Sequence, residues 1–123
     1  MRYLTARKRA EGKGASHTGT EHHWFMTVSA VGLALIIPVW LFIIGRALGS
    51  DFATVQATFA RPIPAITTAL VLVAGLQHFN KGFQIMIEDY THGTTRKAFV
   101  TLMTAFTYGL MATGLFALAK MAL

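Results

Sequence analysis

Three long stretches of this sequence contain no Asp, Glu, Lys or Arg: residues 22–45, 62–80 and 98–119. Each is close to the ~20 residues that a helix needs to cross a hydrocarbon core of ~30 Å. The chain is 54% hydrophobic and only 13% charged, whereas an ordinary soluble domain has roughly 25% charged residues. A chain of 123 residues has too little interior to bury so much apolar surface in water. The sequence therefore predicts an all-α membrane protein with three transmembrane helices.

The predicted organisation has two parts, a basic tail over residues 1–21 and a three-helix transmembrane domain over residues 22–123. The spans are expected at about 24–45, 64–88 and 98–120. The first apolar run is longer than the 7–15 residues of a secretory signal, so we expect it to remain in the mature protein.

Positive charge is unevenly distributed along the chain. Five of the eleven Lys and Arg residues precede position 14, and Arg96 and Lys97 lie in the second loop, which gives seven on one side of the membrane. Arg46, Arg61 and Lys120 give three on the other side. The positive-inside rule then places the N-terminus in the cytoplasm and the C-terminus in the periplasm of a bacterial inner membrane. Because the basic residues lie outside the apolar runs, anionic lipid headgroups explain the net charge of +6 better than nucleic acid does.

Cap and turn residues indicate where the helices begin. Ser50 is the expected cap of a short helix on the outer surface, since apolar residues recur after it at i, i+3 and i+7. These residues are Phe52, Val55 and Phe59. Proline is well tolerated in the first turn of a helix, so Pro62 is expected to begin the second span.

The second predicted span carries the chemistry of the chain. The sequence has no cysteine, which excludes disulfide frameworks, Cys-ligated iron–sulfur clusters and thiolate nucleophiles. The first half of the span is plainly apolar, but polar side chains become frequent from Gln77 to Tyr90. Ionisable groups inside a span are costly unless they are paired or enclosed by protein, which makes them candidate functional groups.

One face of this helix brings three residues together. Asp89 lies eleven residues after His78, so it returns to within about 20° of the same direction at a rise of roughly 16 Å. Gly82 lies about 40° away on the same stripe. The stripe thus carries an imidazole deep in the membrane, a bare glycine one turn later and a carboxylate at the cytoplasmic edge.

His78 has two interpretations. A neutral imidazole in an apolar interior is a common axial ligand of haem iron, and a nearby glycine gives a flat macrocycle room beside the backbone. Alternatively, His78 is hydrogen-bonded to a neighbouring helix. No other histidine of the chain lies deep in a predicted span. A haem held by two histidines would therefore need its second ligand from another subunit.

The spacing from His78 through Gly82 to Asp89 and Tyr90 lies on the second of three spans, after a basic tail. In this arrangement the chain resembles the small hydrophobic membrane anchor subunit of succinate dehydrogenase, respiratory complex II, and in particular its alphaproteobacterial members. The resemblance covers nearly the whole chain, including residues 19–24 at the entry to the first helix and residues 87–90 at the exit of the second. The His-to-Asp-Tyr spacing is its specific part.

The resemblance implies roles for individual residues. His78 would be one axial ligand of haem b, and the cytochrome b anchor subunit would supply the other. Tyr90 would contact the ubiquinone headgroup beside the iron–sulfur subunit, and Asp89 would support that site. A flavoprotein subunit would oxidise succinate in the tricarboxylic acid cycle, because the anchor has no succinate-oxidising centre of its own.

One position departs from the family pattern. Many members have an arginine at the cytoplasmic start of the first helix that meets a haem propionate, and Thr27 stands there in this chain. Lys81, one turn toward the cytoplasm from His78, is a candidate replacement. It fits equally well a lysine whose side chain extends along the helix toward lipid headgroups.

Two classes of function follow. The first is the anchor of a succinate:ubiquinone oxidoreductase, with the anchor of a fumarate reductase as a close alternative. The second is a non-redox transporter or scaffold subunit in which His78, Lys81 and Asp89 form a proton or ion path. A dithionite-reducible b-type haem that depends on His78 would separate the two classes.

Overall fold

The computed structural model describes residues 5–6 and 19–122, so the expected basic tail, residues 1–21, lies almost entirely outside the described residues. The elements from residue 19 onward are all helices: α2 (Gly19–Ala47), α3 (Phe52–Phe59), α4 (Pro62–Tyr90) and α5 (Gly93–Ala122). Three of them, α2, α4 and α5, are long and apolar enough to cross a membrane. The predicted all-α fold with three transmembrane helices is thereby confirmed.

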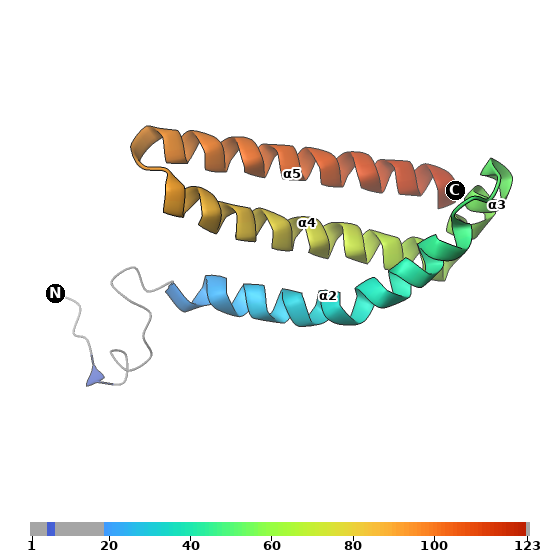
Figure 1. Cartoon of the computed structure of the whole chain (residues 1–123), viewed down its shortest axis with the longest axis horizontal. Helices are drawn as coiled ribbons and strands as arrows, with labels where there is room; N and C mark the ends of the chain where they lie inside the picture. The colour runs from blue at the N-terminus through green and yellow to red at the C-terminus, as the bar shows by residue number, and fades with distance from the viewer. Residues whose placement is uncertain (1–4, 7–18, 123) are drawn as a thin grey trace.

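The three long helices lie side by side in one layer, with α4 in the middle (Figure 1). α4 packs against both α2 and α5, whereas α2 and α5 do not touch each other. The start of α2 and the α4–α5 turn lie at one end of the layer, and α3 lies at the other end beside the end of α5. A layer one helix thick is not a closed bundle, because both of its faces remain open.

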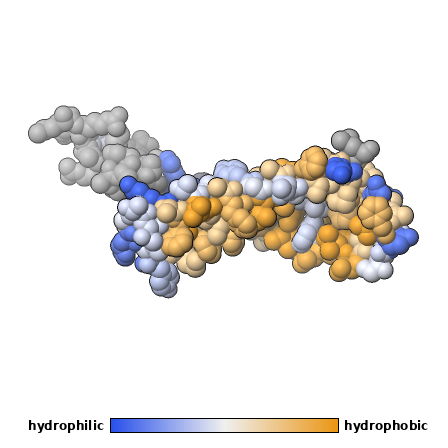
Figure 2. Space-filling model, turned by 90° about the horizontal axis from the view of Figure 1, so that it is seen from above, coloured by the Kyte–Doolittle hydropathy of each residue, from blue (hydrophilic) through white to orange (hydrophobic). Residues whose placement is uncertain are grey.

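Apolar side chains cover the middle of this elongated molecule, and polar side chains gather toward its two ends (Figure 2). Large hydrophobic residues are exposed on every long helix, among them Leu35, Leu70 and Phe116. Such a surface is unfavourable in water and matches the hydrocarbon core of a bilayer. An apolar environment outside the chain, rather than a core within it, covers this surface.

The connections explain where the helices begin and end. The expectation that Ser50 caps α3 is wrong: Asp51 is the cap, and its Oδ1 accepts a hydrogen bond of 2.9 Å from the Thr54 N–H. Hydrogen bonds from the side chain and backbone of Thr54 lower the pKa of Asp51, which keeps this capping carboxylate charged. Pro62 begins α4 as expected. Gly49 (φ 78°) and Gly93 (φ 61°) occupy the left-handed region at the two turns, which glycine enters at little cost.

α4 is held between its neighbours by close contacts at glycine. On the α5 side, a Cβ added to Gly114 would lie 2.7 Å from Leu72 Cδ2, so the absence of a side chain lets the two helices approach. α2 contains Pro38 and is bent along its length (Figure 1), as expected for a proline that removes a helical hydrogen bond. These contacts hold α4 in position between α2 and α5, and they thereby position the polar second half of this span.

Candidate functional site

Three contacts, spaced about one turn apart, join α2 to α4 around the deep histidine. In order along the interface they are Leu33 with Gly75, Ser29 with His78, and Met26 with Gly82. The two helices run in opposite directions, so residues ascending in α2 meet residues descending in α4. The two glycines leave room for the α2 side chains. Between them lies the only polar pair of the three, the Ser29 hydroxyl with the His78 imidazole.

His78 uses one ring nitrogen within the chain and leaves the other open. Its Nδ1 lies 2.8 Å from the Ser29 hydroxyl oxygen. Its Nε2 has no hydrogen-bond partner among the described residues, and this atom is not fully buried. The side chain is half-buried, so Nε2 is accessible from outside the chain. The expected hydrogen bond to a neighbouring helix is therefore present, and it occupies only Nδ1.

The surroundings of His78 bear on what could bind at Nε2. A Cβ at Gly82 would meet Met26 Cε at 3.5 Å, an ordinary contact distance. A flat group lying against Gly82 would therefore touch Met26 as well. Lys81 is half-buried beside this region. The Thr27 hydroxyl donates to the His23 carbonyl oxygen at 3.0 Å and adds no charge.

A metal site made from protein ligands alone is not found here. No group of three or more His, Asp or Glu side chains in the described part of the chain could hold a metal ion. An iron inside a macrocycle needs only an axial ligand from each side. One accessible imidazole nitrogen in an apolar span could supply one of these two ligands.

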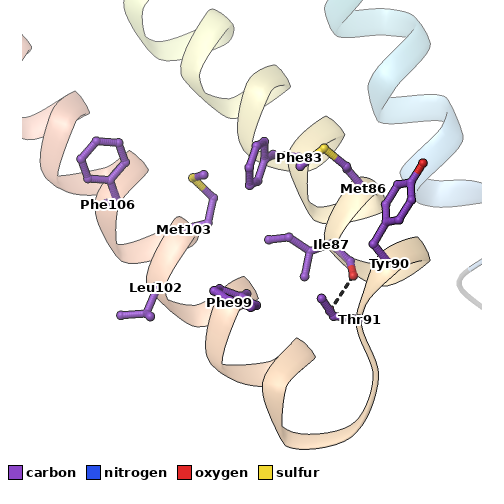
Figure 3. Close-up of a pocket in the computed structure, with 9 residues that line it drawn as sticks. All are labelled: Phe83, Met86, Ile87, Tyr90, Thr91, Phe99, Leu102, Met103 and Phe106. Atoms are coloured by element: carbon purple, nitrogen blue, oxygen red, sulfur yellow. Dashed lines mark hydrogen bonds between the residues drawn. The ribbon is translucent and has the colours of Figure 1, made fainter.

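The end of α4 near the α4–α5 turn carries a second feature, an apolar groove of about 440 Å³ between α4 and α5. Figure 3 shows its lining: Phe83, Met86, Ile87, Tyr90, Thr91, Phe99, Leu102, Met103 and Phe106. Tyr90 lies at its edge with the ring extending away from α5, and 83% of this residue is exposed. The Thr91 hydroxyl donates to the Ile87 carbonyl at 2.6 Å. Tyr90 thus lines the groove at its edge, and its hydroxyl, which has no hydrogen-bond partner among the described residues, points away from α5.

Asp89 and Tyr90 lie at the same end of α4 but on different sides of it. Asp89 is exposed and does not line the apolar groove. Consecutive residues in a helix point about 100° apart, so the Asp89 stripe continues toward α2 while Tyr90 borders the groove. Asp89 and Tyr90 therefore do not line this groove together.

Two parts of the site were missed from the sequence. Ser29 was not identified, although a hydroxyl in an otherwise apolar span was a signal for it. Ser29 and His78 are 49 residues apart in sequence, and their pairing depends on the register of two antiparallel helices. The groove was not identified either, because its apolar lining cannot be told from a lipid-facing surface by periodicity.

Comparison with known proteins gives a consistent result. The sequence model of a family described as "Succinate dehydrogenase/Fumarate reductase transmembrane subunit" matches residues 1–117. The chain is 47% identical over 123 residues to the succinate dehydrogenase hydrophobic membrane anchor subunit of Paracoccus denitrificans, covering 100% of this chain and 95% of that protein. It is 28% identical over 83 residues to the subunit of the same name from Rickettsia bellii (strain RML369-C), covering 67% and 66%. No solved structure matches it significantly.

Proposed function

Because this chain belongs to the succinate dehydrogenase/fumarate reductase transmembrane subunit family, we propose that it anchors a succinate:ubiquinone oxidoreductase in the membrane and takes part in its quinone reduction. The anchor supplies one axial ligand of a haem b and part of the ubiquinone site. Succinate is oxidised in the flavoprotein subunit, and electrons reach the membrane through the iron–sulfur subunit. The three-helix domain over residues 22–123 is the part that these partners and the lipid enclose.

The open layer of helices supports a second anchor subunit. α2 and α5 do not contact each other, and large hydrophobic side chains remain exposed along all three spans. Helices from a cytochrome b anchor subunit would cover one face of the layer and complete the bundle, while lipid covers the rest. The same face would receive the haem between the two subunits.

The observation that carries the haem proposal is the state of the His78 ring. Nδ1 is held by Ser29 at 2.8 Å, and Nε2 is accessible and has no partner among the described residues. A haem bound there supplies a one-electron carrier within the membrane. His78 would hold the iron from one side, and Lys81 is the candidate cation for a propionate. A haem lying against Gly82 would also touch Met26 of α2, which occupies the space beside that glycine. Each of these residues belongs to this chain, so each role can be tested by substituting one residue at a time.

The ubiquinone proposal rests on Tyr90. Its phenol is a hydrogen-bond donor on a residue that lines an apolar groove, at the end of α4 where the resemblance implies that the quinone would bind. A hydrogen bond from this hydroxyl to a quinone carbonyl becomes stronger as negative charge develops during reduction. Asp89, exposed one residue earlier, is a candidate proton donor from the aqueous side. The groove offers space for the apolar part of the substrate.

The orientation proposal follows from the two ends of the layer. The α4–α5 turn and the start of α5, which carries Arg96 and Lys97, lie at the same end as the start of α2. Arg46, Arg61 and Lys120 belong to the opposite end. The excess of Lys and Arg places the first end in the cytoplasm.

A reporter fused after Leu123 tests this orientation. We expect alkaline phosphatase, which requires export, to be active there, and green fluorescent protein to be dark. The same reporters inserted into the α4–α5 turn should give the reverse pattern and serve as the control. Phosphatase activity at the turn instead of after Leu123 would show that the orientation is the reverse of the one proposed.

Deleting the chain tests the anchoring role. In cells that lack it, we expect most succinate oxidation with a soluble artificial acceptor to move from the membrane fraction to the soluble fraction, because the hydrophilic subunits lose their attachment. Expression of the chain from a plasmid should return the activity to the membrane. If the activity remains membrane-bound without this chain, it is not the anchor.

The anchor of a fumarate reductase remains the second candidate, because the description of the matched family includes that enzyme. Both relatives described above are named as succinate dehydrogenase subunits, which favours succinate oxidation. The direction supported by the purified complex with ubiquinone distinguishes the two.

A further inference from the structure

The Ser29 hydroxyl has three polar neighbours and a single hydrogen to share among them. Its oxygen lies 2.7 Å from the Phe25 carbonyl oxygen and 3.2 Å from the Met26 carbonyl oxygen, both in α2. It lies 2.8 Å from His78 Nδ1 in α4. The two carbonyl oxygens are acceptors only. The position of the hydroxyl hydrogen therefore determines whether Ser29 donates a hydrogen bond to His78 or accepts one from it.

The short distance to the Phe25 carbonyl oxygen indicates that this oxygen accepts the hydroxyl hydrogen. A serine inside a helix commonly donates to the carbonyl four residues earlier, and the 2.7 Å separation is a good O–H···O distance. When Ser29 donates its hydrogen to the Phe25 carbonyl oxygen, its own oxygen still has lone pairs that can accept a hydrogen bond from His78. The hydrogen of the neutral imidazole then lies on Nδ1, and Nε2 keeps its lone pair.

From this geometry we infer that Ser29 is a positioning residue, which holds His78 in the Nδ1–H tautomer and aims Nε2 out of the chain as a ligand. The inference rests on the proposed haem role of His78 and adds to it a residue of α2. The opposite tautomer would leave a hydrogen on Nε2, where it would block coordination and have no acceptor among the described residues.

The same hydrogen bond acts on the electronic character of the ligand. An acceptor on Nδ1–H makes the imidazole a more basic ligand and fixes the plane of its ring. A more basic axial ligand favours the oxidised iron, so the bond lowers the midpoint potential. Because the Ser29 hydroxyl itself donates to a carbonyl, it is polarised into a better acceptor. Removal of the hydroxyl is therefore expected to raise the midpoint potential.

A graded series at Ser29 in the assembled complex tests the inference, read out by equilibrium redox titration of the haem and by electron paramagnetic resonance of its oxidised form. Ser29→Ala should raise the midpoint potential, alter the resonance and weaken haem retention about 10- to 100-fold. Ser29→Cys should shift the potential less, since sulfur is a weak acceptor. Ser29→Thr keeps the hydroxyl and should stay near the wild type.

Thr107→Val provides a matched control on α5. Thr107 is buried, and its hydroxyl also donates to the carbonyl four residues earlier, that of Met103, at 2.8 Å. This variant deletes a comparable hydroxyl away from His78, so the potential should not move. A fall in haem content without a change in the potential of the remaining haem, for Ser29→Ala or Ser29→Cys, would indicate packing alone and overturn the inference.

His78→Ala in parallel separates failure of the inference from failure of the proposed function. If His78→Ala removes the haem signal while Ser29→Ala and Ser29→Cys keep the wild-type potential, only the role of Ser29 is overturned. If His78→Ala leaves the haem signal unchanged, the haem role and the inference built on it both fail. Should Ser29→Ala not assemble, the comparison of Ser29→Cys with Ser29→Thr decides, because both keep a similar volume.

Discussion

Replacement of His78 by alanine is expected to abolish the low-spin b-type spectrum of the purified complex. The substitution deletes the imidazole whose Nε2 is accessible from outside the chain, and the described residues nearby offer no second histidine to replace it. An iron with one axial ligand missing becomes high-spin or is lost. The absorbance difference between dithionite-reduced and oxidised protein measures this directly.

His92→Ala is a suitable control for the His78 experiment. His92 is exposed in the α4–α5 turn, roughly 20 Å along the helix axis from His78 at 1.5 Å per residue, and its removal should leave the spectrum unchanged. His78→Gly with added imidazole provides a second arm, since free imidazole can refill the cavity and restore the low-spin form. An unchanged low-spin spectrum and potential in both His78 variants would remove His78 from the ligand set.

Removal of the Tyr90 hydroxyl is expected to reduce succinate-to-ubiquinone turnover about 10- to 100-fold, the equivalent of roughly 1–3 kcal/mol. Tyr90→Phe keeps the ring at the rim of the groove and deletes only the donor. Since 83% of Tyr90 is exposed in this chain, its hydroxyl is free to act on a substrate held between subunits. Succinate oxidation with an artificial acceptor that bypasses the membrane site should be retained.

Tyr108→Phe is the matched control for this prediction. Tyr108 is also exposed, on α5, and does not line the groove. Its replacement should leave quinone turnover at the wild-type level. If Tyr90→Phe behaves like Tyr108→Phe in an assembled complex, with inhibitor sensitivity preserved, Tyr90 is an interfacial aromatic residue and other groups bind the quinone.

The elements of the fold were predictable because their signals are local. A run without charged side chains long enough to cross a bilayer predicts a span, and Pro62 begins α4 as its position indicated. The cap of α3 was displaced by one residue. Ser50 and Asp51 are both good capping types, and the choice between them depends on which one the Thr54 N–H reaches.

The arrangement of the helices was not predictable in the same way. Nothing local in the sequence states that α4 lies between α2 and α5, since that order depends on contacts such as Gly114 with Leu72. The helical stripe through His78 and Asp89 was read from periodicity alone. Periodicity does not tell which neighbour covers a face, so it did not reveal that α2 packs over His78 and that Asp89 is exposed.

One affinity purification of the complex, read by its difference spectrum and its subunit composition, tests the haem and anchoring proposals together. The complex would be purified from membranes through an affinity tag on this chain, and its spectrum recorded after reduction by succinate and then by dithionite. We expect one set of b-type bands, together with flavoprotein and iron–sulfur subunits in the same preparation identified by mass spectrometry. A preparation that contains those subunits but no haem would contradict the role of His78. A haem-free chain that purifies without them would contradict the anchor itself.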